Sequence, residues 1–294
     1  THKAGDKYAI SGSADPLFAD ANNNVWFSVF GLGINYCNLG SVKFSHVLTQ
    51  SEAEKFDANN FVRALATDHF GNVYCSLQKG GFVVLDTAYQ FTKRLLPHSD
   101  WPAEVCLTDR SGNIWIGSHQ LHRYNPNTKK LQELPWGAGA IYTLYQLRDG
   151  RILIGSYDHA WIFDAKTNLI YRLEGIDERA VYTSFFELPN GQLLACARDL
   201  SVRLYQPKGD DYTLLKVIKE NVYVKHTIRQ NDTLLLMATT NGLYQYNINR
   251  QKMLPLDVVN RQMPDTYCYA IQKSQSGFYY VSTSNTINKA ITTN

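Results

Sequence analysis

The sequence predicts an all-β protein, a seven-bladed β-propeller with four antiparallel strands in each blade. Three observations predict this fold. A nine-residue pattern, a turn followed by a strand, recurs about every 42 residues along the 294-residue chain. Further short apolar runs and polar turns flank each copy. No segment of about 12 residues keeps the apolar spacing of a helix. Repeats of this length and content are typical of propeller blades.

The repeated pattern centres on one aromatic or aliphatic residue of a strand. The clear copies are ANNNVWFSV (21–29), HFGNVYCSL (69–77), RSGNIWIGS (110–118) and RDGRILIGS (148–156). The weaker copies are PNGQLLACA (189–197), NDTLLLMAT (231–239) and QSGFYYVST (275–283). The central residues are Trp26, Tyr74, Trp115, Leu153, Leu194, Leu236 and Tyr280. We expect these side chains to pack between blades. The register of the sixth copy stays open, because that copy has an extra residue after its turn.

Each unit has the same internal order. An apolar run such as VRALATD leads into an Asp/Asn–Gly turn, whose glycine adopts positive φ without strain. The next strand ends in Gly, Ser or Ala, and a loop leads to a third strand such as LHRYNP or AWIFDA. A polar turn such as NPNT and a fourth run such as KLQEL complete the unit.

These units make the chain (1–294) a single propeller domain. The blades are expected at about residues 15–60, 61–102, 103–140, 141–180, 181–222, 223–265 and 266–294. The last unit is short, and an open ring would leave a bare strand edge. We therefore expect residues 7–11 (KYAIS) to add the outer strand of the last blade. The N-terminal strand would then close the ring, with both termini in one blade.

Composition excludes several classes of function. The net charge is +3 and Lys and Arg are scattered, which argues against a nucleic-acid partner. No apolar run reaches the roughly 18 residues of a membrane helix, so we expect no membrane contact by this segment. The five cysteines lie in apolar runs without a CxxC motif, which favours buried free thiols. The common phosphate-loop, zinc and serine-nucleophile motifs are absent, so the sequence predicts no cofactor and no catalytic residue.

Residues 109–128 (DRSGNIWIGSHQLHRYNPNT) carry a resemblance to a known family. The pattern D-x-x-G-N-I-W-I-G-S/T, a loop, and then L-x-R-Y-N/D-P-x-T resembles the two-component regulator propeller repeat. The match is nearly position for position, apart from a shorter loop. Residues 23–39 resemble a second copy and residues 241–247 a partial one. The resemblance spans about residues 15–290 and is looser in the last three units.

This resemblance implies a function that composition and periodicity do not show. The family forms the periplasmic sensor half of hybrid two-component system histidine kinases in bacteria that degrade polysaccharides. The chain would then be one propeller, the N-terminal one, of a larger sensor ectodomain in an inner-membrane protein. The resemblance implies an oligosaccharide ligand, and as partners a second propeller and further domains of the parent chain. The kinase, and the parts that form a homodimer of the parent, would lie outside this segment.

A ligand is expected where loops converge near the axis of a propeller. These loops precede each innermost strand or join the second and third strands. Sugars stack an apolar face on Trp or Tyr, while Arg, Asp and His bind their hydroxyls. The candidate ligand-binding residues are Trp101, Trp136, Tyr157, Asp158, His159, Arg179, Arg198 and Asp199.

Two other functions stay open. A propeller polysaccharide lyase or glycoside hydrolase would use a pair of carboxylates, and Asp158, Glu178 and Asp199 lie in these loops, although no spacing singles out two. A protein-interaction scaffold would expose a large apolar patch instead. His119 and His122 stand three residues apart and could share a metal ion, but packed or solvated histidines are the interpretation we favour. We therefore expect a sensor rather than an enzyme, with no metal and no cofactor.

Overall fold

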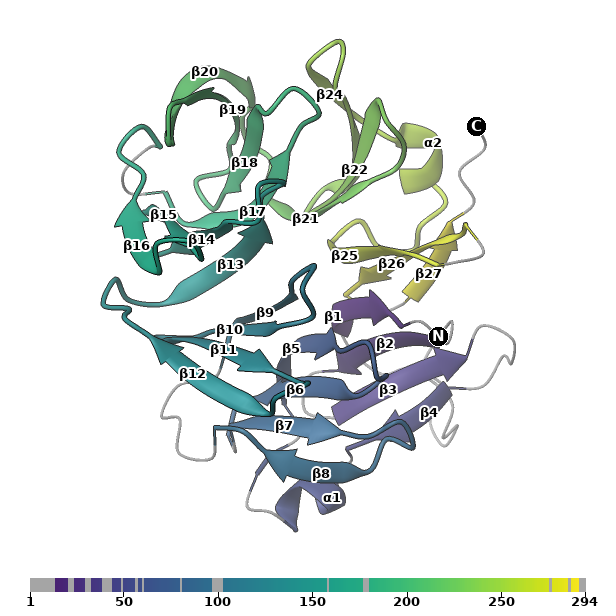
Figure 1. The fold of residues 1–294 in the computed structure, drawn as a ribbon. Helices are drawn as coiled ribbons and strands as arrows, with labels where there is room; N and C mark the ends of the chain where they lie inside the picture. The colour runs from purple at the N-terminus through teal and green to yellow at the C-terminus, as the bar shows by residue number, and fades with distance from the viewer. Residues whose placement is uncertain are drawn as a thin grey trace.

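The computed structural model describes residues 14–20, 24–29, 33–38, 44–48, 50–55, 58–59, 61–79, 81–96, 103–157, 159–176, 180–274, 277–284 and 287–290. Short antiparallel sheets surround a central axis, and the first strand of each sheet lies innermost (Figure 1). The chain is an all-β propeller, as its repeats predict.

The sheets follow one another along the chain, and each is a simple meander. The first contains β1 (Ala14–Ala19), β2 (Asn24–Val29), β3 (Gly33–Asn38) and β4 (Phe44–Val47). The second contains β5 (Val62–Thr67), β6 (Val73–Leu77), β7 (Phe82–Leu85) and β8 (Phe91–Arg94). The third contains β9 (Val105–Thr108), β10 (Ile114–Gly117), β11 (Leu121–Asn125) and β12 (Lys130–Leu134).

The second half of the chain continues the same order. The fourth sheet contains β13 (Ile141–Gln146), β14 (Ile152–Ser156), β15 (Ala160–Asp164) and β16 (Leu169–Arg172). The fifth contains β17 (Tyr182–Glu187), β18 (Leu193–Ala197), β19 (Val202–Lys208) and β20 (Asp211–Lys219). The sixth contains β21 (Val224–Arg229), β22 (Leu234–Thr239), β23 (Gly242–Asn247) and β24 (Lys252–Pro255). The last contains β25 (Cys268–Lys273), β26 (Tyr279–Thr283) and β27 (Ile287–Ala290).

The predicted ring of seven four-stranded blades closed by an N-terminal strand is wrong. In the described part of the chain, six blades have four strands, and the last sheet has three. β1 forms a hairpin with β2, as the first strand of every other sheet does with its second, so it belongs to the first sheet, and no strand among the described residues adds a fourth to the last sheet. β1 contacts β25 and β26 across a gap between sheets rather than by strand pairing. Residues 7–11, for which the closing strand is predicted, lie outside the described residues.

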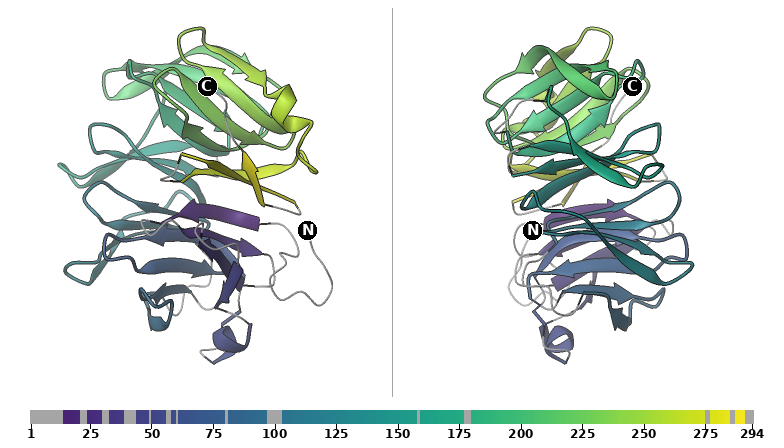
Figure 2. Two further views of the ribbon diagram at one scale, coloured as in Figure 1. Left: turned by 90° about the vertical axis from the view of Figure 1, so that its right-hand side faces the viewer. Right: turned by 60° about the vertical axis from the view of Figure 1, so that its left-hand side comes forward.

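Helix is confined to two short segments of the described chain. α1 (Gln50–Glu54) lies between β4 and β5, and α2 (Asp257–Asn260) lies between β24 and β25. α1 projects beyond the sheets at the edge of the molecule (Figures 1 and 2). Within the ranges that the structure covers, no helix has the length and hydrophobicity that crossing a bilayer requires.

The central residue of the repeat has the same pairing in each blade. Trp115 of β10 pairs with Leu107, eight residues earlier, and Leu153 of β14 pairs with Tyr145 at the same interval. Leu236 also pairs with Ile228, eight residues earlier, so the sixth copy keeps the common register despite its extra turn residue. Six of the seven central side chains are at most 2% exposed, which confirms their predicted packing role. Tyr280, in the three-stranded sheet, is only half-buried.

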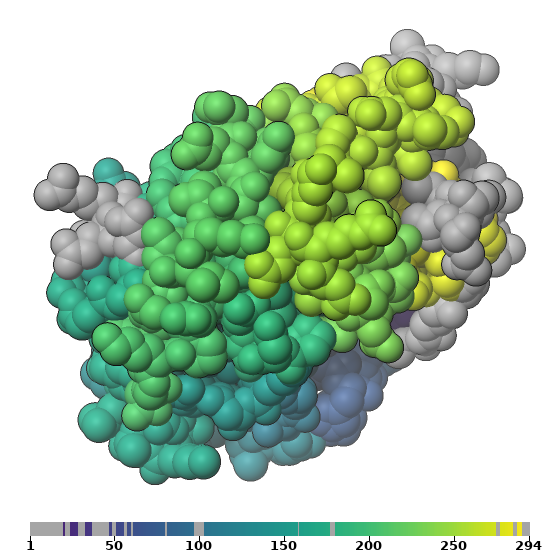
Figure 3. Space-filling model, turned by 90° about the horizontal axis from the view of Figure 1, so that it is seen from above, coloured from purple at the N-terminus to yellow at the C-terminus, as the bar shows by residue number. Residues whose placement is uncertain are grey.

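A small residue follows two positions after each central residue. These positions hold Ser28, Ser76, Gly117, Gly155, Cys196, Ala238 and Ser282. A Cβ atom on Gly155 would lie 2.5 Å from Cγ2 of Thr143 and 3.2 Å from Cβ of Tyr182, on the innermost strand of the next blade. The glycine of the W-I-G-S pattern therefore permits close packing between blades. Figure 3 shows the fifth and sixth blades (green and yellow-green) lying side by side, and residues of both share one apolar cluster.

Candidate functional site

The innermost strands of five sheets begin with a β-bulge. The residue left out of the pairing is the second of each strand: Arg63, Tyr142, Thr183, Lys225 and Tyr269. A bulge leaves one residue unpaired and changes the direction of its side chain. All five residues line one cavity of about 560 Å³, bounded by the innermost strands, which we call the axial cavity.

The residue before each bulge anchors the start of its strand. These residues are Val62, Ile141, Tyr182, Val224 and Cys268, and each is at most 6% exposed. An anchored side chain followed by a bulged one fixes where the second side chain emerges. The bulges therefore set the composition of the axial cavity, and their rigid position comes from the blade cores.

The axial cavity is cationic and aromatic. Arg63 donates a hydrogen bond to Glu104 over 2.8 Å. Arg198 lies over the ring of Tyr142, at 4.4 Å from its centroid. Lys225 lies among three tyrosines, with its Nζ 4.8 Å from the ring centroid of Tyr223, 5.4 Å from that of Tyr269 and 5.8 Å from that of Tyr267. The described lining residues thus include three cations and one carboxylate.

A second cavity, of about 790 Å³, adjoins the third and fourth blades, and we call it the aromatic cleft. Its lining includes Trp136, Tyr157, Trp161, His119, His159 and Tyr142. The rings of Trp136 and Trp161 meet edge to face, with centroids 5.6 Å apart. Both indoles are half-buried, whereas Tyr157 is 63% exposed. Half-buried aromatic rings in a cleft present apolar faces on which a sugar ring can stack.

Hydrogen bonds fix the two indoles of the aromatic cleft. Trp136 lies in the connection between β12 and β13, and its Nε1 donates to the carbonyl oxygen of Gly139 over 2.7 Å. Gly139 has φ +79°, a conformation that glycine adopts without strain. Trp161 is on β15, and its Nε1 donates to Oγ of Ser156 over 3.2 Å. Because each indole N–H is already satisfied within the protein, the rings offer a ligand mainly their apolar faces.

A polar chain borders the same cleft. Arg172 pairs with Trp161 across β15 and β16, and its Nη1 lies 3.0 Å from Nε2 of His159. Arginine can only donate, so Nε2 of His159 accepts and the ring proton is assigned to Nδ1. Arg172 also donates to Glu174 over 2.8 Å, and this hydrogen bond lowers the pKa of the Glu174 carboxyl group. Charged donors and an acceptor therefore stand beside the aromatic rings.

Tyr142 joins the two cavities, because it lines both of them. Arg198 covers its ring from the side of the axial cavity. A ligand with several rings could extend from the aromatic cleft across Tyr142 to the cations of the axial cavity. The arrangement suits a molecule with both apolar faces and polar substituents.

The structure brings four of the eight candidate residues to these cavities. Trp136, Tyr157 and His159 line the aromatic cleft, and Arg198 lines the axial cavity. Asp199 lines neither. It accepts hydrogen bonds from the backbone N–H of Ser201 over 3.1 Å and from Arg203. Burial tends to raise the pKa of Asp199, but hydrogen bonds from Ser201 and Arg203 outweigh burial and lower it. Trp101, Asp158 and Arg179 lie outside the described residues.

Sequence reasoning missed Trp161, Tyr142, Arg63 and Lys225. Trp161 follows a second-to-third-strand loop by one residue, so a slightly wider window would have included it. The other three are bulge residues, and a bulge leaves no distinct mark in one sequence. The available signal is positional: the second residue of each of the five bulged strands lines the axial cavity.

The predicted free thiols are confirmed for four cysteines. Cys75, Cys196 and Cys268 are buried, Cys106 is half-buried, and all four are free. Burial raises the pKa of each of these thiols. Of the two histidines considered for a metal, His119 lines the aromatic cleft, whereas His122 is buried beside Glu133.

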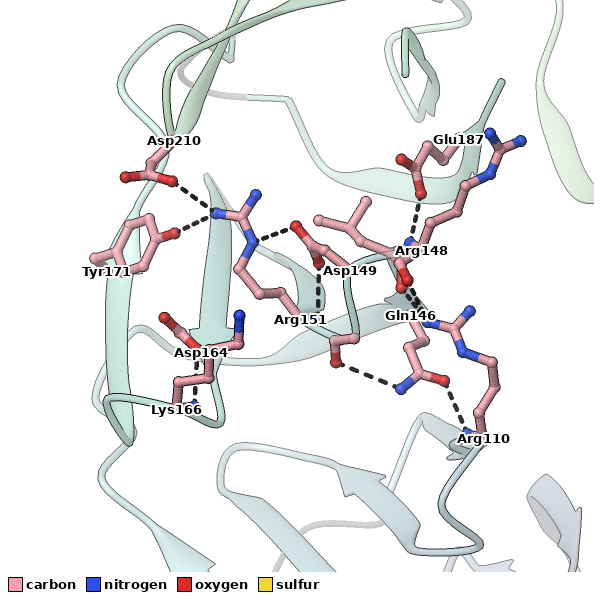
Figure 4. Close-up of polar contacts among 12 residues, drawn as sticks. Arg110, Gln146, Arg148, Asp149, Arg151, Asp164, Lys166, Tyr171, Glu187 and Asp210 are labelled. Carbon is pink, nitrogen blue, oxygen red and sulfur yellow. Dashed lines mark hydrogen bonds and ion pairs between the residues drawn. The ribbon is translucent and has the colours of Figure 1, made fainter. Parts of the chain in front are cut away.

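The opposite face has a cavity of about 520 Å³, in which Arg151 pairs with two carboxylates. Arg151 donates to Asp149 and to the hydroxyl of Tyr171, each over 2.8 Å, and approaches Asp210 at 3.4 Å (Figure 4). Next to it, the backbone N–H of Arg148 donates to Glu187 of the next blade over 2.6 Å. These contacts join neighbouring blades, so we assign this face a structural role.

Comparisons with known proteins support the propeller fold and show no family for the chain. The chain matches no protein-family model, and no curated protein matches it in sequence. Two structures of the extracellular domain of BT4673 from B. thetaiotaomicron, described in one case as a hybrid two component system, match it with a TM-score of 0.75 and 16% identity. They cover 97% of this chain, which in turn spans only 39% and 38% of theirs.

Enzymes share the same fold. Virginiamycin B lyase from Staphylococcus aureus matches with a TM-score of 0.74 and 11% identity, over 95% of this chain and 94% of that chain.

A secretion-system component shares the fold as well. PorZ of Porphyromonas gingivalis, a surface component of the type-IX secretion system, matches with a TM-score of 0.74 and 11% identity, over 92% of this chain and 45% of that chain. At these identities the likeness establishes a propeller fold alone.

Proposed function

We propose that this chain is the ligand-binding propeller of an extracytoplasmic sensor, and that its ligand is an oligosaccharide. The aromatic cleft is the observation that carries this proposal. Two half-buried indoles with satisfied N–H groups, an exposed tyrosine and an Arg–His–Glu chain combine stacking surfaces with hydroxyl-binding groups. The likeness to the BT4673 extracellular domain supports a sensor of this kind.

In this proposal the chain binds sugar without converting it. Among the described residues that line the two cavities, Glu104 is the single carboxylate, and it already accepts a hydrogen bond from Arg63. Hydrolysis of a glycoside by the usual route needs a pair of carboxyl groups, one on each side of the glycosidic bond. Signalling would pass to a kinase outside this chain, and it requires that the ligand contact two states of the receptor differently.

Calorimetric titration with a panel of oligosaccharides tests the proposal. The protein used should include any ectodomain sequence that follows Asn294, since a second propeller could complete the site. We expect saturable binding without product. Trp161→Ala should weaken it about tenfold, the loss of roughly one stacked aromatic contact. Phe70→Ala is the matched control, because Phe70 is 53% exposed on the turn between β5 and β6, outside both cavities.

Three results would count against the proposal. If no glycan released or absorbed heat, the proposal that the ligand is an oligosaccharide would be refuted. Equal binding by wild type and Trp161→Ala would move the site away from the aromatic cleft. Conversion of a glycan to a new product, detected by mass spectrometry, would favour a lyase or hydrolase.

A further inference from the structure

The axial cavity is positively charged, and binding of a neutral sugar does not need this charge. Arg63, Arg198 and Lys225 line it together with one carboxylate, Glu104. The whole chain has only a small net charge of +3, so three cations in one cavity are a local concentration. A concave site lined by one sign of charge attracts ligands of the opposite sign.

Among the described residues, two of these cations have aromatic rather than acidic neighbours. Arg198 lies over Tyr142, and Lys225 lies among Tyr223, Tyr267 and Tyr269. Aromatic faces hold a cation in place without neutralising its charge. Arg63, by contrast, has Glu104 as a partner. Arg198 and Lys225 therefore keep a full charge directed at a ligand in the cavity.

The cations are held on rigid supports. Lys225 is the bulged residue of β21, and the residue before it, Val224, is fully buried. The neighbouring bulge of β25 presents Tyr269, whose hydroxyl group can donate to an anion, whereas the Thr183 hydroxyl already donates to the carbonyl oxygen of Val224 over 2.8 Å. Fixed donors that surround a low-dielectric cavity bind an oxyanion more strongly than the same groups on a mobile surface.

We propose that the axial cavity is an oxyanion subsite that holds a carboxylate or sulfate group of an acidic oligosaccharide. This inference rests on the proposed function and narrows its substrate class. The sugar rings would stack in the aromatic cleft, Tyr142 would lie beneath the junction, and the anionic substituent would bind Arg198 and Lys225. A volume of about 560 Å³ accommodates a charged sugar residue and its bound water.

The experiment compares acidic sugars with their neutral counterparts. Uronate oligosaccharides are titrated beside their carboxyl-reduced forms, and sulfated oligosaccharides beside their desulfated forms, so the two arms identify which oxyanion is bound. We expect the acidic member of one pair to bind at least about tenfold more tightly, as charged hydrogen bonds provide. Its affinity should also fall with added salt, whereas that of the neutral member should not.

A double variant, Lys225→Gln/Arg198→Gln, assigns this preference to the cavity. We expect it to remove the preference, so that the acidic and the neutral member of the pair bind with equal affinity. Lys216→Gln/Lys252→Gln is the matched control, because it removes the same charge from exposed positions on β20 and β24. It should change neither affinity.

The outcomes separate this inference from the function on which it rests. If neutral and acidic sugars bind equally well, or if the preference persists in the double variant, the oxyanion subsite is refuted while sugar binding stands. If no sugar of either kind binds, both proposals fail. Should the double variant unfold, the salt dependence of the wild-type protein decides: equal salt responses for both members of a pair refute the subsite.

Discussion

The indole Nε1 of Trp115 donates a 2.8 Å hydrogen bond to Oδ2 of Asp109, six residues earlier in the chain. The same pair recurs in the second blade, where Tyr74 donates to Asp68 over 2.8 Å, and in the first, where Trp26 donates to Asp20 over 2.7 Å. Each aspartate also accepts the backbone N–H four residues later. One carboxylate thus joins the turn to the core residue of the next strand.

In the fourth and fifth blades this polar pair is replaced by an apolar one. Leu147 and Leu153 occupy the two positions in the fourth blade and belong to one apolar cluster, as Leu188 and Leu194 do in the fifth. The turn then receives its acceptor from another residue: Oδ1 of Asp149 accepts the N–H of Arg151 over 2.9 Å. In these two blades the two positions therefore change together.

This exchange predicts the outcome of transferring the apolar pair to the third blade. Asp109→Leu alone should lower the free energy of unfolding by about 2–4 kcal/mol, because it leaves the buried indole N–H and the turn without an acceptor. Adding Ser111→Asp and Trp115→Leu should recover part of this loss, up to the cost of the smaller side chain. Urea denaturation measures both variants. A triple variant no more stable than the additive expectation would refute the coupling.

The close approach of Gly155 to Thr143, its partner on the neighbouring strand of the same blade, predicts the effect of one added methyl group. Gly155→Ala places a Cβ atom 2.5 Å from Cγ2 of Thr143, and overpacking of this kind costs about 1–3 kcal/mol. Thermal denaturation should show the loss. Gly137→Ala is the control, since no atom lies within 4 Å of its added Cβ. Gly155→Ala/Thr143→Ser, which removes the obstructing methyl group, should recover stability; no recovery would place the strain elsewhere.

Most of the fold that could be predicted, namely the positions of the strands and turns, followed from the sequence repeat. A strand period of two and a turn glycine locate β10 or β14 from a few residues, because hairpin geometry is local. Closure was not predictable, because pairing between the two ends of the chain depends on residues far apart in the sequence. In the described part of the chain the last sheet has three strands.

The candidate site was predictable only in part, for a similar reason. Loop composition singled out Trp136, Tyr157 and His159, because aromatic residues in loops stand out against a polar background. Lys225 and Tyr142 belong to strands, and a regular strand would alternate their direction in a simple way. The bulges change that direction, and they are set by inter-strand pairing rather than by the local residues.

Buried histidine predicts a loss of stability in mild acid. His122 is 5% exposed, and burial lowers its pKa below the ordinary 6.5, although Glu133 partly opposes this. Burial also lowers the pKa of His226, whose Nδ1 accepts the N–H of Ile271 over 3.2 Å. Between the folded-state pKa and 6.5 the unfolded chain binds more protons, so the free energy of unfolding falls as the pH falls.

Urea denaturation across this pH range measures the effect. Each histidine can contribute a slope of at most about 1.4 kcal/mol per pH unit. His122→Leu should reduce the slope, because it removes one of the two buried histidines. The substitution leaves no buried group without a hydrogen-bond partner, since Nδ1 of His122 has none and the Glu133 side chain is 61% exposed. An unaltered slope in His122→Leu would show that its protonation is not coupled to unfolding.

The position of Tyr142 between the two cavities gives the sharpest test of a continuous ligand site. Tyr142→Ala removes the ring that lines both cavities and that supports Arg198, so it should weaken binding of neutral and acidic sugars alike, by about tenfold. Tyr142→Phe keeps the ring and should stay within about threefold of wild type. Calorimetry on both variants, with thermal denaturation to confirm folding, distinguishes the ring from the hydroxyl. If Tyr142→Ala weakened only acidic sugars, the ring would serve to position Arg198 and would not contact the sugar, and the cleft and the cavity would be separate sites.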